Sequence, residues 1–207
     1  MALRSVVPAE SIAALSFDFG TPRNPCLGRA GGFVDAGPSG NPFQPGEYVV
    51  VSKISFEDRR FNPDLVEFHQ HAKAMAGSVG YTAKLAIDGQ LAQLLRLRVA
   101  QLNPCSYCLI LHNRAAMDQG IAPERIANLP SWRESTLYSE AERAALAYCE
   151  ALTIFDQASF AAAHDEVAKQ YCEVEIAEIA AVIINMNVWT RLKLAQGATP
   201  VKAHDSA

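Results

Sequence analysis

Apolar positions change their spacing near residue 63, and this change divides the chain into two parts. From Pro63 onward they recur every three to four residues, as they do along one face of an α-helix. Six segments carry this spacing and are predicted to be helices: 64–77, 88–102, 104–119, 139–153, 156–169 and 173–195. The chain is therefore predicted to be all-α, with residues 63–197 forming one helical domain.

Capping residues indicate where two of these helices begin. Asp88 is a good N-cap for the segment 88–102, whose leucines and valine fall along one apolar stripe. Ser139, followed three residues later by Glu142, matches the capping box that opens a helix. The last long segment, 173–195, is apolar on nearly every side, so we expect it to be the buried central helix.

The first 62 residues have a different composition. Seven of the twelve glycines and six of the eleven prolines fall before residue 47, which predicts an N-terminal arm that is mostly irregular. Within the arm, Tyr48–Ser52 has strand propensity but no obvious partner strand. Residues 198–207 form a polar tail that we expect to fray. The predicted organisation is thus arm 1–62, helical domain 63–197 and tail 198–207.

Charge and hydropathy narrow the functional classes. The net charge is −4 and the isoelectric point is about 5.7, with charges interspersed along the chain, which disfavours a nucleic-acid partner. No apolar run is long enough for a transmembrane helix, so no membrane partner is expected. The first twenty residues contain Pro8 and Glu10 in place of a signal-peptide core, and we expect a cytoplasmic protein.

One stretch carries candidate chemistry, because Cys105, Cys108 and His112 fall on one face of a predicted helix. Asn103 is a good N-cap and Pro104 suits the first helical position, which would place Cys105 in the first turn. There the free N–H groups and the helix dipole stabilise a thiolate. His112, four residues after Cys108, could accept its proton or hold its thiolate as an ion pair.

The Cys-x-x-Cys pair is compatible with three kinds of site. A zinc site would have three ligands in Cys105, Cys108 and His112 but no evident fourth. Two inert core thiols would also fit the helix face. A redox dithiol is favoured, in which one thiolate attacks an oxidant or disulfide and the other resolves the product, with no cofactor or metal. His69 and His71 are two residues apart and are expected at the surface.

The run Leu95–His112 resembles the signature of the carboxymuconolactone decarboxylase superfamily, in its alkylhydroperoxidase AhpD-like branch. The segments Trp132–Thr153 and Ile184–Leu192 are similar to later parts of the same pattern, so the resemblance covers about residues 63–195. It implies an AhpD-like helical bundle that forms a homo-oligomer (trimer, hexamer or dimer). It also implies a cysteine-based peroxidase or disulfide reductase that contains neither metal nor haem.

The resemblance implies a role for each site residue. Cys108 would be oxidised to a sulfenic acid, Cys105 would resolve it, and His112 would relay protons. Gln93 stands where the family has a glutamate, twelve residues before the first cysteine, and an amide cannot exchange a proton near neutral pH. Tyr107 occupies the position between the cysteines where the best-characterised branch carries a histidine.

The expected function is therefore a thiol-dependent peroxidase or disulfide oxidoreductase that reduces organic hydroperoxides. Its partners would be a small hydroperoxide or disulfide substrate and a thiol electron donor. Two alternatives stay open. One is a non-catalytic, redox-sensing helical oligomer, which Gln93 in place of a glutamate makes more credible. The other is a carboxymuconolactone decarboxylase-like lyase that acts on a small acid.

Overall fold

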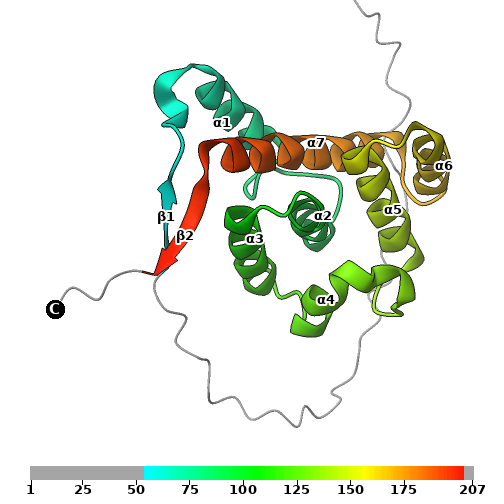
Figure 1. Ribbon diagram of the computed structural model, residues 1–207. Coiled ribbons are helices and arrows are strands. Elements are labelled where there is room, and N and C mark those ends of the chain that lie inside the picture. The colour runs from blue at the N-terminus through cyan, green and yellow to red at the C-terminus, as the bar shows by residue number, and fades with distance from the viewer. Residues whose placement is uncertain (1–53, 203–207) are drawn as a thin grey trace, which may run out of the picture. The chain divides into compact units, whose positions relative to one another are not determined.

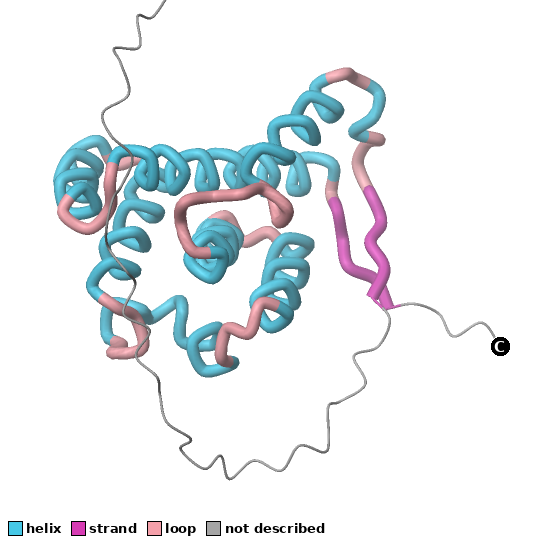
Figure 2. The backbone as a smooth tube through the Cα atoms, turned by 180° about the vertical axis from the view of Figure 1, so that it is seen from behind, coloured by secondary structure: helices cyan, strands magenta, loops and turns pink. Residues whose placement is uncertain are grey.

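The structure, a computed structural model, describes residues 54–202. Helices make up most of this part, and two short strands complete it (Figures 1 and 2). The elements in chain order are β1 (Ile54–Asp58), the 3-10 turn η2 (Pro63–Leu65), α1 (Phe68–Val79), α2 (Gly89–Leu102), α3 (Ser106–Asp118), α4 (Pro123–Asn128), the 3-10 segment η3 (Leu129–Glu134), α5 (Glu140–Ile154), α6 (Gln157–Ala168), α7 (Glu173–Gln196) and β2 (Ala198–Lys202).

The predicted fold class is confirmed, since all six expected helices are present and their ends lie within four residues of the predicted ones. The short helix α4 and the segment η3 were not predicted. Six residues are too few to show a 3.6-residue period, and Pro123 and Pro130 in this stretch read only as turn signals. The helical pattern therefore identified the long elements and missed the short connection between α3 and α5.

Helix α2 is the centre of the bundle, and α3, α5 and α7 pack around it (Figures 1 and 2). Its Leu94, Leu95 and Val99 are completely buried. The expectation that the last long segment would be the buried central helix is only partly right. Helix α7 buries Ile179 and Ile183 against the core but exposes other apolar side chains, namely Val174, Ile184 and Leu194. An evenly apolar sequence does not reveal which face of a helix is covered.

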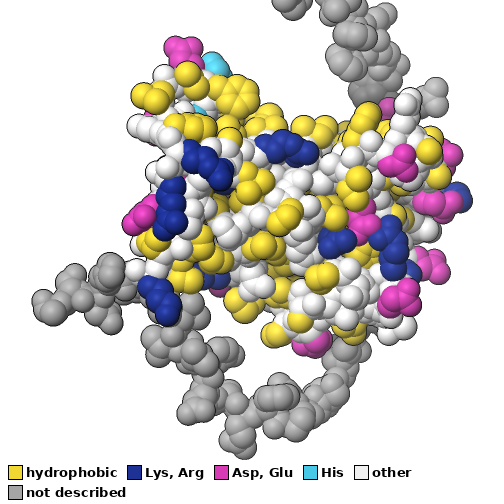
Figure 3. All heavy atoms as spheres, in the orientation of Figure 1, with side chains coloured by type: hydrophobic (Ala, Val, Ile, Leu, Met, Phe, Trp, Pro, Cys, Tyr) yellow, Lys and Arg dark blue, Asp and Glu magenta, His cyan; other side chains and the backbone are white. Residues whose placement is uncertain are grey.

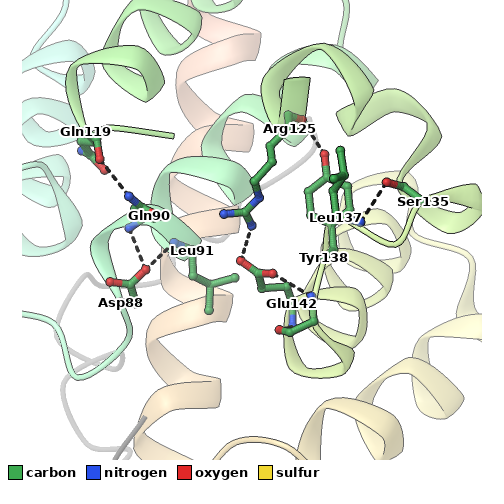
Figure 4. Close-up of polar contacts among 10 residues, drawn as sticks. Asp88, Gln90, Leu91, Gln119, Arg125, Ser135, Leu137, Tyr138 and Glu142 are labelled. Carbon is green, nitrogen blue, oxygen red and sulfur yellow. Dashed lines mark hydrogen bonds and ion pairs between the residues drawn. The ribbon is translucent and has the colours of Figure 1, made fainter. Parts of the chain in front are cut away.

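Side-chain caps hold the start of α2 and link it to the end of α3 (Figure 4). The carboxylate of Asp88, the predicted N-cap, accepts hydrogen bonds from the backbone N–H groups of Gln90 and Leu91. The amide of Gln90 then donates to the backbone oxygen of Gln119 at 3.0 Å. This bond joins the two helices that carry the candidate site.

The predicted capping box of α5 is also present, and it ties α5 to α4 (Figure 4). The Ser139 hydroxyl accepts from the N–H of Glu142, and the Glu142 carboxylate accepts from the N–H of Ser139. The same carboxylate forms an ion pair with Arg125 of α4. The Tyr138 hydroxyl donates to the backbone oxygen of Arg125. One carboxylate thus caps a helix and fixes its neighbour.

The strands β1 and β2 form an antiparallel pair in which Phe56 lies opposite Pro200. The sequence pattern places β1 in the irregular arm and β2 in a frayed tail, and it does not predict this pairing. The expected strand at Tyr48–Ser52 lies outside the described residues. Gly197, with a φ of 73°, ends α7 and turns the chain into β2. Because the two strands are so far apart in sequence, no local pattern predicts that they pair.

None of the helices between residues 54 and 202 is both long and apolar enough to cross a bilayer.

Candidate active site

Cys105 and Cys108 lie at the N-terminal end of α3 with their sulfur atoms 2.8 Å apart. Cys105 is the N-cap residue, and its Sγ accepts a hydrogen bond from the backbone N–H of Cys108 at 3.4 Å. A disulfide bond is about 2.0 Å long, so a small movement of either side chain would close one. The geometry therefore suits reversible disulfide formation.

The cap of α3 differs from the sequence expectation. Asn103 was expected to cap this helix, but it ends α2, where its backbone N–H donates to the oxygen of Val99. Its side chain donates to Asn187 and Thr190 of α7. Cys105 takes the capping position instead, because its sulfur can accept from the helix N–H as a serine oxygen would. The thiol is therefore closer to the free N–H groups than predicted.

The two thiols share one proton unequally. The hydrogen bond from Cys108 lowers the pKa of Cys105 to about 7, and backbone N–H groups act in the same direction. The same hydrogen bond and burial raise the pKa of Cys108. At pH 7 about half of the molecules therefore carry a thiolate at Cys105, and in these Cys108 is the thiol that donates to it. The positive charge of Lys193 favours the thiolate form of the pair.

His112 is held by Gln93 of the neighbouring helix α2, and both side chains are buried. The Gln93 Nε2 donates to the backbone oxygen of His112 at 2.8 Å and lies 3.4 Å from the His112 Nδ1. The Nε2 of the Gln93 amide can only donate, so the Nδ1 of His112 is an acceptor. The proton of the His112 imidazole is therefore on its own Nε2. The Tyr81 hydroxyl lies 2.9 Å from the same Nδ1.

The imidazole of His112 is neutral near pH 7. Burial, aided by the charge of Arg96, lowers its pKa to about 4. Its hydrogen bonds go to Gln93 and Tyr81. The expected ion pair between His112 and a Cys108 thiolate is therefore not supported. An ion pair with a thiolate requires an imidazolium, and a buried imidazole beside a cation is neutral instead.

Tyr107 packs beside the dithiol between two other elements. Its ring meets Phe56 of β1 edge to face, with centroids 4.5 Å apart. Lys193 of α7 places its Nζ 4.6 Å from the centre of the same ring. Burial, followed by the two neighbouring thiols, raises the pKa of the Tyr107 phenol. Lys193 and Phe56 were not predicted as site residues, since nothing near them in sequence marks them.

A cavity of about 570 Å³ opens beside Cys108 and lies among α1, α2, α3 and α7. Tyr107, Cys108 and His112 line one wall. His69, Asn185 and Trp189 of α1 and α7 also line the cavity, together with the cations Lys73, Arg96 and Lys193. No Asp or Glu of residues 54–202 lines the cavity. The dithiol therefore faces a pocket that is partly apolar and positively charged.

His69 was expected at the surface, and this prediction is wrong. Its side chain is only 6% exposed, and its Nδ1 lies 2.7 Å from Asp64. The ring packs edge to face on Trp189 of α7, with centroids 5.6 Å apart. Helix α1 turns this residue toward α7 and leaves His71 exposed. The burial of one histidine depends on a helix far away in sequence.

Among residues 54–202, no group of three or more His, Cys, Asp and Glu side chains is arranged to hold a metal ion.

Comparisons with known proteins agree with this fold. Residues 67–151 match the model of the carboxymuconolactone decarboxylase family. The uncharacterized protein YdfG of Bacillus subtilis is 29% identical over 126 residues, which are 60% of this chain and 86% of that protein. A crystal structure from Agrobacterium tumefaciens, ATU0492, is that of a protein of unknown function and candidate antioxidant defence protein AhpD. It is 25% identical and superposes with a TM-score of 0.60 over 64% of this chain and 90% of that one.

A second solved structure, that of the debrominase Bmp8, has the same fold. It is 24% identical, with a TM-score of 0.54 over 67% of this chain and 72% of the other. At this identity the likeness concerns the fold alone. The predicted AhpD-like bundle is confirmed by the Agrobacterium structure, and the chemistry has to be argued from the residues of the site.

Proposed function

We propose that this chain, whose residues 67–151 match the carboxymuconolactone decarboxylase family model, is a thiol-dependent peroxidase and disulfide oxidoreductase that reduces organic hydroperoxides. The observation that carries the proposal is the pair of sulfurs 2.8 Å apart, which share one proton at the edge of a cavity. Cys108 lines that cavity, whereas Cys105 lies behind it, so a substrate would meet Cys108 first.

In the first step, the Cys108 sulfur attacks the terminal oxygen of the hydroperoxide. The Cys105 thiolate takes the Cys108 proton along their hydrogen bond. An S–O bond forms as the O–O bond breaks, two electrons pass from sulfur to the peroxide, and an alkoxide leaves. Cys108 is then a sulfenic acid. Cys105 is therefore the base in this step. His112 cannot take this role, because its Nε2 already carries a proton and its Nδ1 is already hydrogen-bonded.

In the second step, the Cys105 thiol gives its proton to the alkoxide, which leaves as the alcohol. The regenerated Cys105 thiolate attacks the Cys108 sulfur and displaces hydroxide, so a disulfide forms. A thiol electron donor then returns two electrons through thiol–disulfide exchange and restores the pair. Such a cycle requires a reducing compartment, and we therefore assign the protein to the cytoplasm.

His112 acts as a hydrogen-bond donor in this proposal. Its Nε2–H can stabilise the oxygen on which negative charge develops as the O–O bond breaks. Gln93 positions the ring through its two contacts with His112 and exchanges no proton itself. Tyr107 lines the cavity beside Cys108, and the Nζ of Lys193 lies over its ring. The substitution of a glutamine for the family's glutamate thus changes the relay and leaves the dithiol in place.

Steady-state consumption of cumene hydroperoxide with dithiothreitol as the donor tests the proposal. Wild-type protein should turn over repeatedly, and mass spectrometry should find a Cys105–Cys108 disulfide after one equivalent of peroxide. Cys105→Ser lacks both the base and the resolving thiol, so it should react more slowly and stop at the sulfenic acid of Cys108, which dimedone traps. Absence of multiple turnovers in the wild type would instead favour the redox-sensing alternative.

The lyase alternative has its own diagnostic. A decarboxylase of the family type would act on a small acid without the two thiols. A variant with both cysteines replaced by serine that still converts a carboxylactone would contradict the thiol mechanism. A variant that loses all activity while it keeps its helical circular dichroism would support it.

We further propose that the chain forms a homo-oligomer. Exposed apolar side chains gather at η2 and the start of α1 (Figure 3), and the most exposed are Leu65, Val66 and Phe68. Such clusters on a soluble domain commonly mark interfaces. Light scattering after size-exclusion chromatography should give a dimer, trimer or hexamer. A monomer at micromolar concentration would contradict this proposal.

A further inference from the structure

Arg96 of α2 is a buried cation that lines the Cys108 cavity. Its side chain is 4% exposed, and it shares the cavity with Cys108 and His112. Within the described part of the chain, no carboxylate forms an ion pair with it. Arginine is almost never fully buried unless it is paired. A buried guanidinium without a counter-ion is therefore the feature that a bound anion would complete.

The contacts of Arg96 are with neutral groups and leave some of its donors unused. Its Nη2 donates to the backbone oxygen of Val79 at 2.7 Å, and its Nη1 donates to the Oε1 of Gln93 at 3.4 Å. The guanidinium lies over the Tyr81 ring, 4.9 Å from its centroid. A guanidinium carries more N–H donors than these two bonds use. Among the polar side-chain atoms of residues 54–202 that packing encloses without a partner, none belongs to Arg96. Its unused N–H groups are therefore open to a ligand.

The surroundings of Arg96 do not neutralise its charge. Val79 ends α1, and the dipole at this C-terminus offsets only part of a unit charge. Burial lowers the pKa of Arg96, and burial together with the Arg96 charge lowers the pKa of His112. Both shifts have the sign expected beside a positive charge in a poorly solvated site. An anion bound to the guanidinium would offset this cost of burial.

The other two cations of the cavity differ from Arg96. Lys73 already has a counter-ion, because its Nζ lies 3.3 Å from the Asp64 carboxylate. Lys193 lies over the rings of Tyr107 and Trp189, and its charge favours the thiolate form of the dithiol. Arg96 is therefore the cation of this cavity that is both deeply buried and without an anionic partner in residues 54–202.

The rest of the cavity selects the kind of anion. Apolar side chains line much of it, namely Ala76, Leu111, Met186 and Trp189. Its volume of about 570 Å³ suits a small organic molecule. The planar donors of a guanidinium match the two oxygens of a carboxylate. A ligand that fits is therefore largely hydrocarbon and carries one carboxylate.

We propose that Arg96 binds a carboxylate of the substrate, at a point remote from the peroxide group that reacts at Cys108. The substrate class is then an apolar organic hydroperoxide that carries a carboxylate, such as the hydroperoxide of a fatty or aromatic acid. The identity of the reacting group rests on the proposed function, whereas the carboxylate site itself does not.

Binding is tested with two alcohols of nearly equal size. They are the products expected from cumene hydroperoxides that carry either a carboxylate or a primary carboxamide on the ring. Calorimetry on the reduced wild type at pH 7 should show that the carboxylate binds about tenfold more tightly, because a hydrogen bond to a charged group is stronger than one to a neutral group. Equal affinities for the two alcohols, with the substituent at the meta and at the para position, would overturn the carboxylate site.

Arg96→Met, which keeps much of the side-chain volume and removes the charge, should abolish this preference. Arg96→Lys keeps the charge without the planar donors and should retain part of it. Arg114→Met is the matched control, since it removes the same charge from an exposed position of α3, and it should keep the tenfold preference. A preference that survives in Arg96→Met would overturn the assignment to Arg96.

Gln93→Glu provides a second variant should Arg96→Met fail to fold. The Oε1 of Gln93 is already 3.4 Å from the Nη1 of Arg96, so a carboxylate at this position would become the missing counter-ion. The preference for the carboxylate alcohol should then fall to about twofold or less. A full tenfold preference in Gln93→Glu would show that another cation binds the carboxylate.

Oxidation of the dithiol by the two parent hydroperoxides separates this inference from the proposed function. A single oxidation of the reduced protein, measured without a thiol donor, assigns any preference to the hydroperoxide. Equal rates with both hydroperoxides, in the wild type and in Arg96→Met, would leave the peroxidase standing and remove the carboxylate site. Arg96-dependent binding of the carboxylate alcohol without any hydroperoxide reduction would leave the site standing and remove the peroxidase. A preference of about tenfold in the rate of oxidation, lost in Arg96→Met, supports both.

Discussion

Two sites in this protein bury cysteine to the same extent and give it opposite chemistry. Cys105, at the start of α3, is 1% exposed, and Cys149, in the middle of α5, is 0% exposed. The pKa of Cys105 is lowered to about 7, chiefly by the hydrogen bond from Cys108. Burial raises the pKa of Cys149 to about 12, with the charge of Glu150 acting in the same direction. Exposure alone therefore does not separate a reactive thiol from an inert one.

The difference comes from what each sulfur can accept. The Cys105 sulfur accepts from a thiol and from a backbone N–H at the open end of a helix. Cys149 lies where the helix N–H groups are already used by its own turns, and its thiol faces the backbone oxygen of Leu95 at 3.8 Å. Only the first arrangement stabilises a thiolate. The reactive pair is also the one that borders the cavity, through Cys108.

The largest expected effect is in alkylation. Because only thiolates react, iodoacetamide should label the Cys105–Cys108 pair of the folded protein at least 10⁴-fold faster than Cys149 at pH 7. The labelling rate of the pair should fall about tenfold per pH unit below the Cys105 pKa of about 7 and level off above it. Peptide mapping after timed quenching measures both rates.

Denatured protein is the control for this comparison, since unfolding should bring the two rates within a few fold of each other. Rapid labelling of Cys149 in the folded state would show that α5 opens readily. A flat pH profile for Cys105 would show that the proton is not shared as described.

The second effect concerns turnover. Cys108→Ser should reduce hydroperoxide turnover by roughly three orders of magnitude, as loss of a nucleophile commonly does. Cys149→Ser should leave turnover unchanged and cost about 1–2 kcal/mol of stability, because it places a hydroxyl in the core. Initial rates and urea unfolding measure the two quantities. Equal loss of turnover in both variants would mean that Cys149 belongs to the mechanism.

Much of the fold could be predicted from the sequence, because long helices carry a repeating pattern. The starts of α2 and α5 are marked by Asp88, Ser139 and Glu142 as well as by the apolar spacing that follows. The pairing of β1 with β2 could not be predicted, since neither strand has a local signal that identifies its partner. Nor could the exact start of α3, where a cysteine caps a helix that asparagine was expected to cap.

The residues of the candidate site were likewise only partly predictable from the sequence. Cys105, Cys108 and His112 were found by helical spacing within a single element, and Gln93 by its distance from the first cysteine. The residues that complete the cavity come from elements remote in sequence, so no spacing placed His69 on α1 or the residues of α7 beside the two cysteines. Spacing also could not reveal the protonation of His112, which depends on its burial beside Arg96.

A third and smaller effect is expected from Gln93→Glu. A carboxylate beside the ring should raise the pKa of His112 above its value of about 4, because it favours the imidazolium. We expect about a tenfold gain in peroxide turnover from the restored acid–base group, at the low end for such groups because Arg96 also contacts this side chain. Histidine NMR titration and initial rates test the two parts. Gln93→Met is the control that removes the polar contacts without adding charge.

The smallest effect should come from Lys193, whose Nζ lies over the Tyr107 ring and whose charge acts to lower the pKa of both thiols. Loss of this cation in Lys193→Met should raise the apparent pKa of the pair and slow Cys105 alkylation at pH 6 by about two- to threefold. Alkylation above pH 8.5 should be unchanged, because the thiolate is then already formed in both proteins. One molar salt should erase the difference, since a partly exposed charge is screened.

Lys202→Met, at an exposed position of β2, is the matched control and should alkylate as the wild type does. A salt-independent slowing in Lys193→Met would show that the lysine acts by packing against Tyr107 and Trp189. The low pKa of Cys105, compared with that of Cys149, would then be due only to the end of the helix and to Cys108.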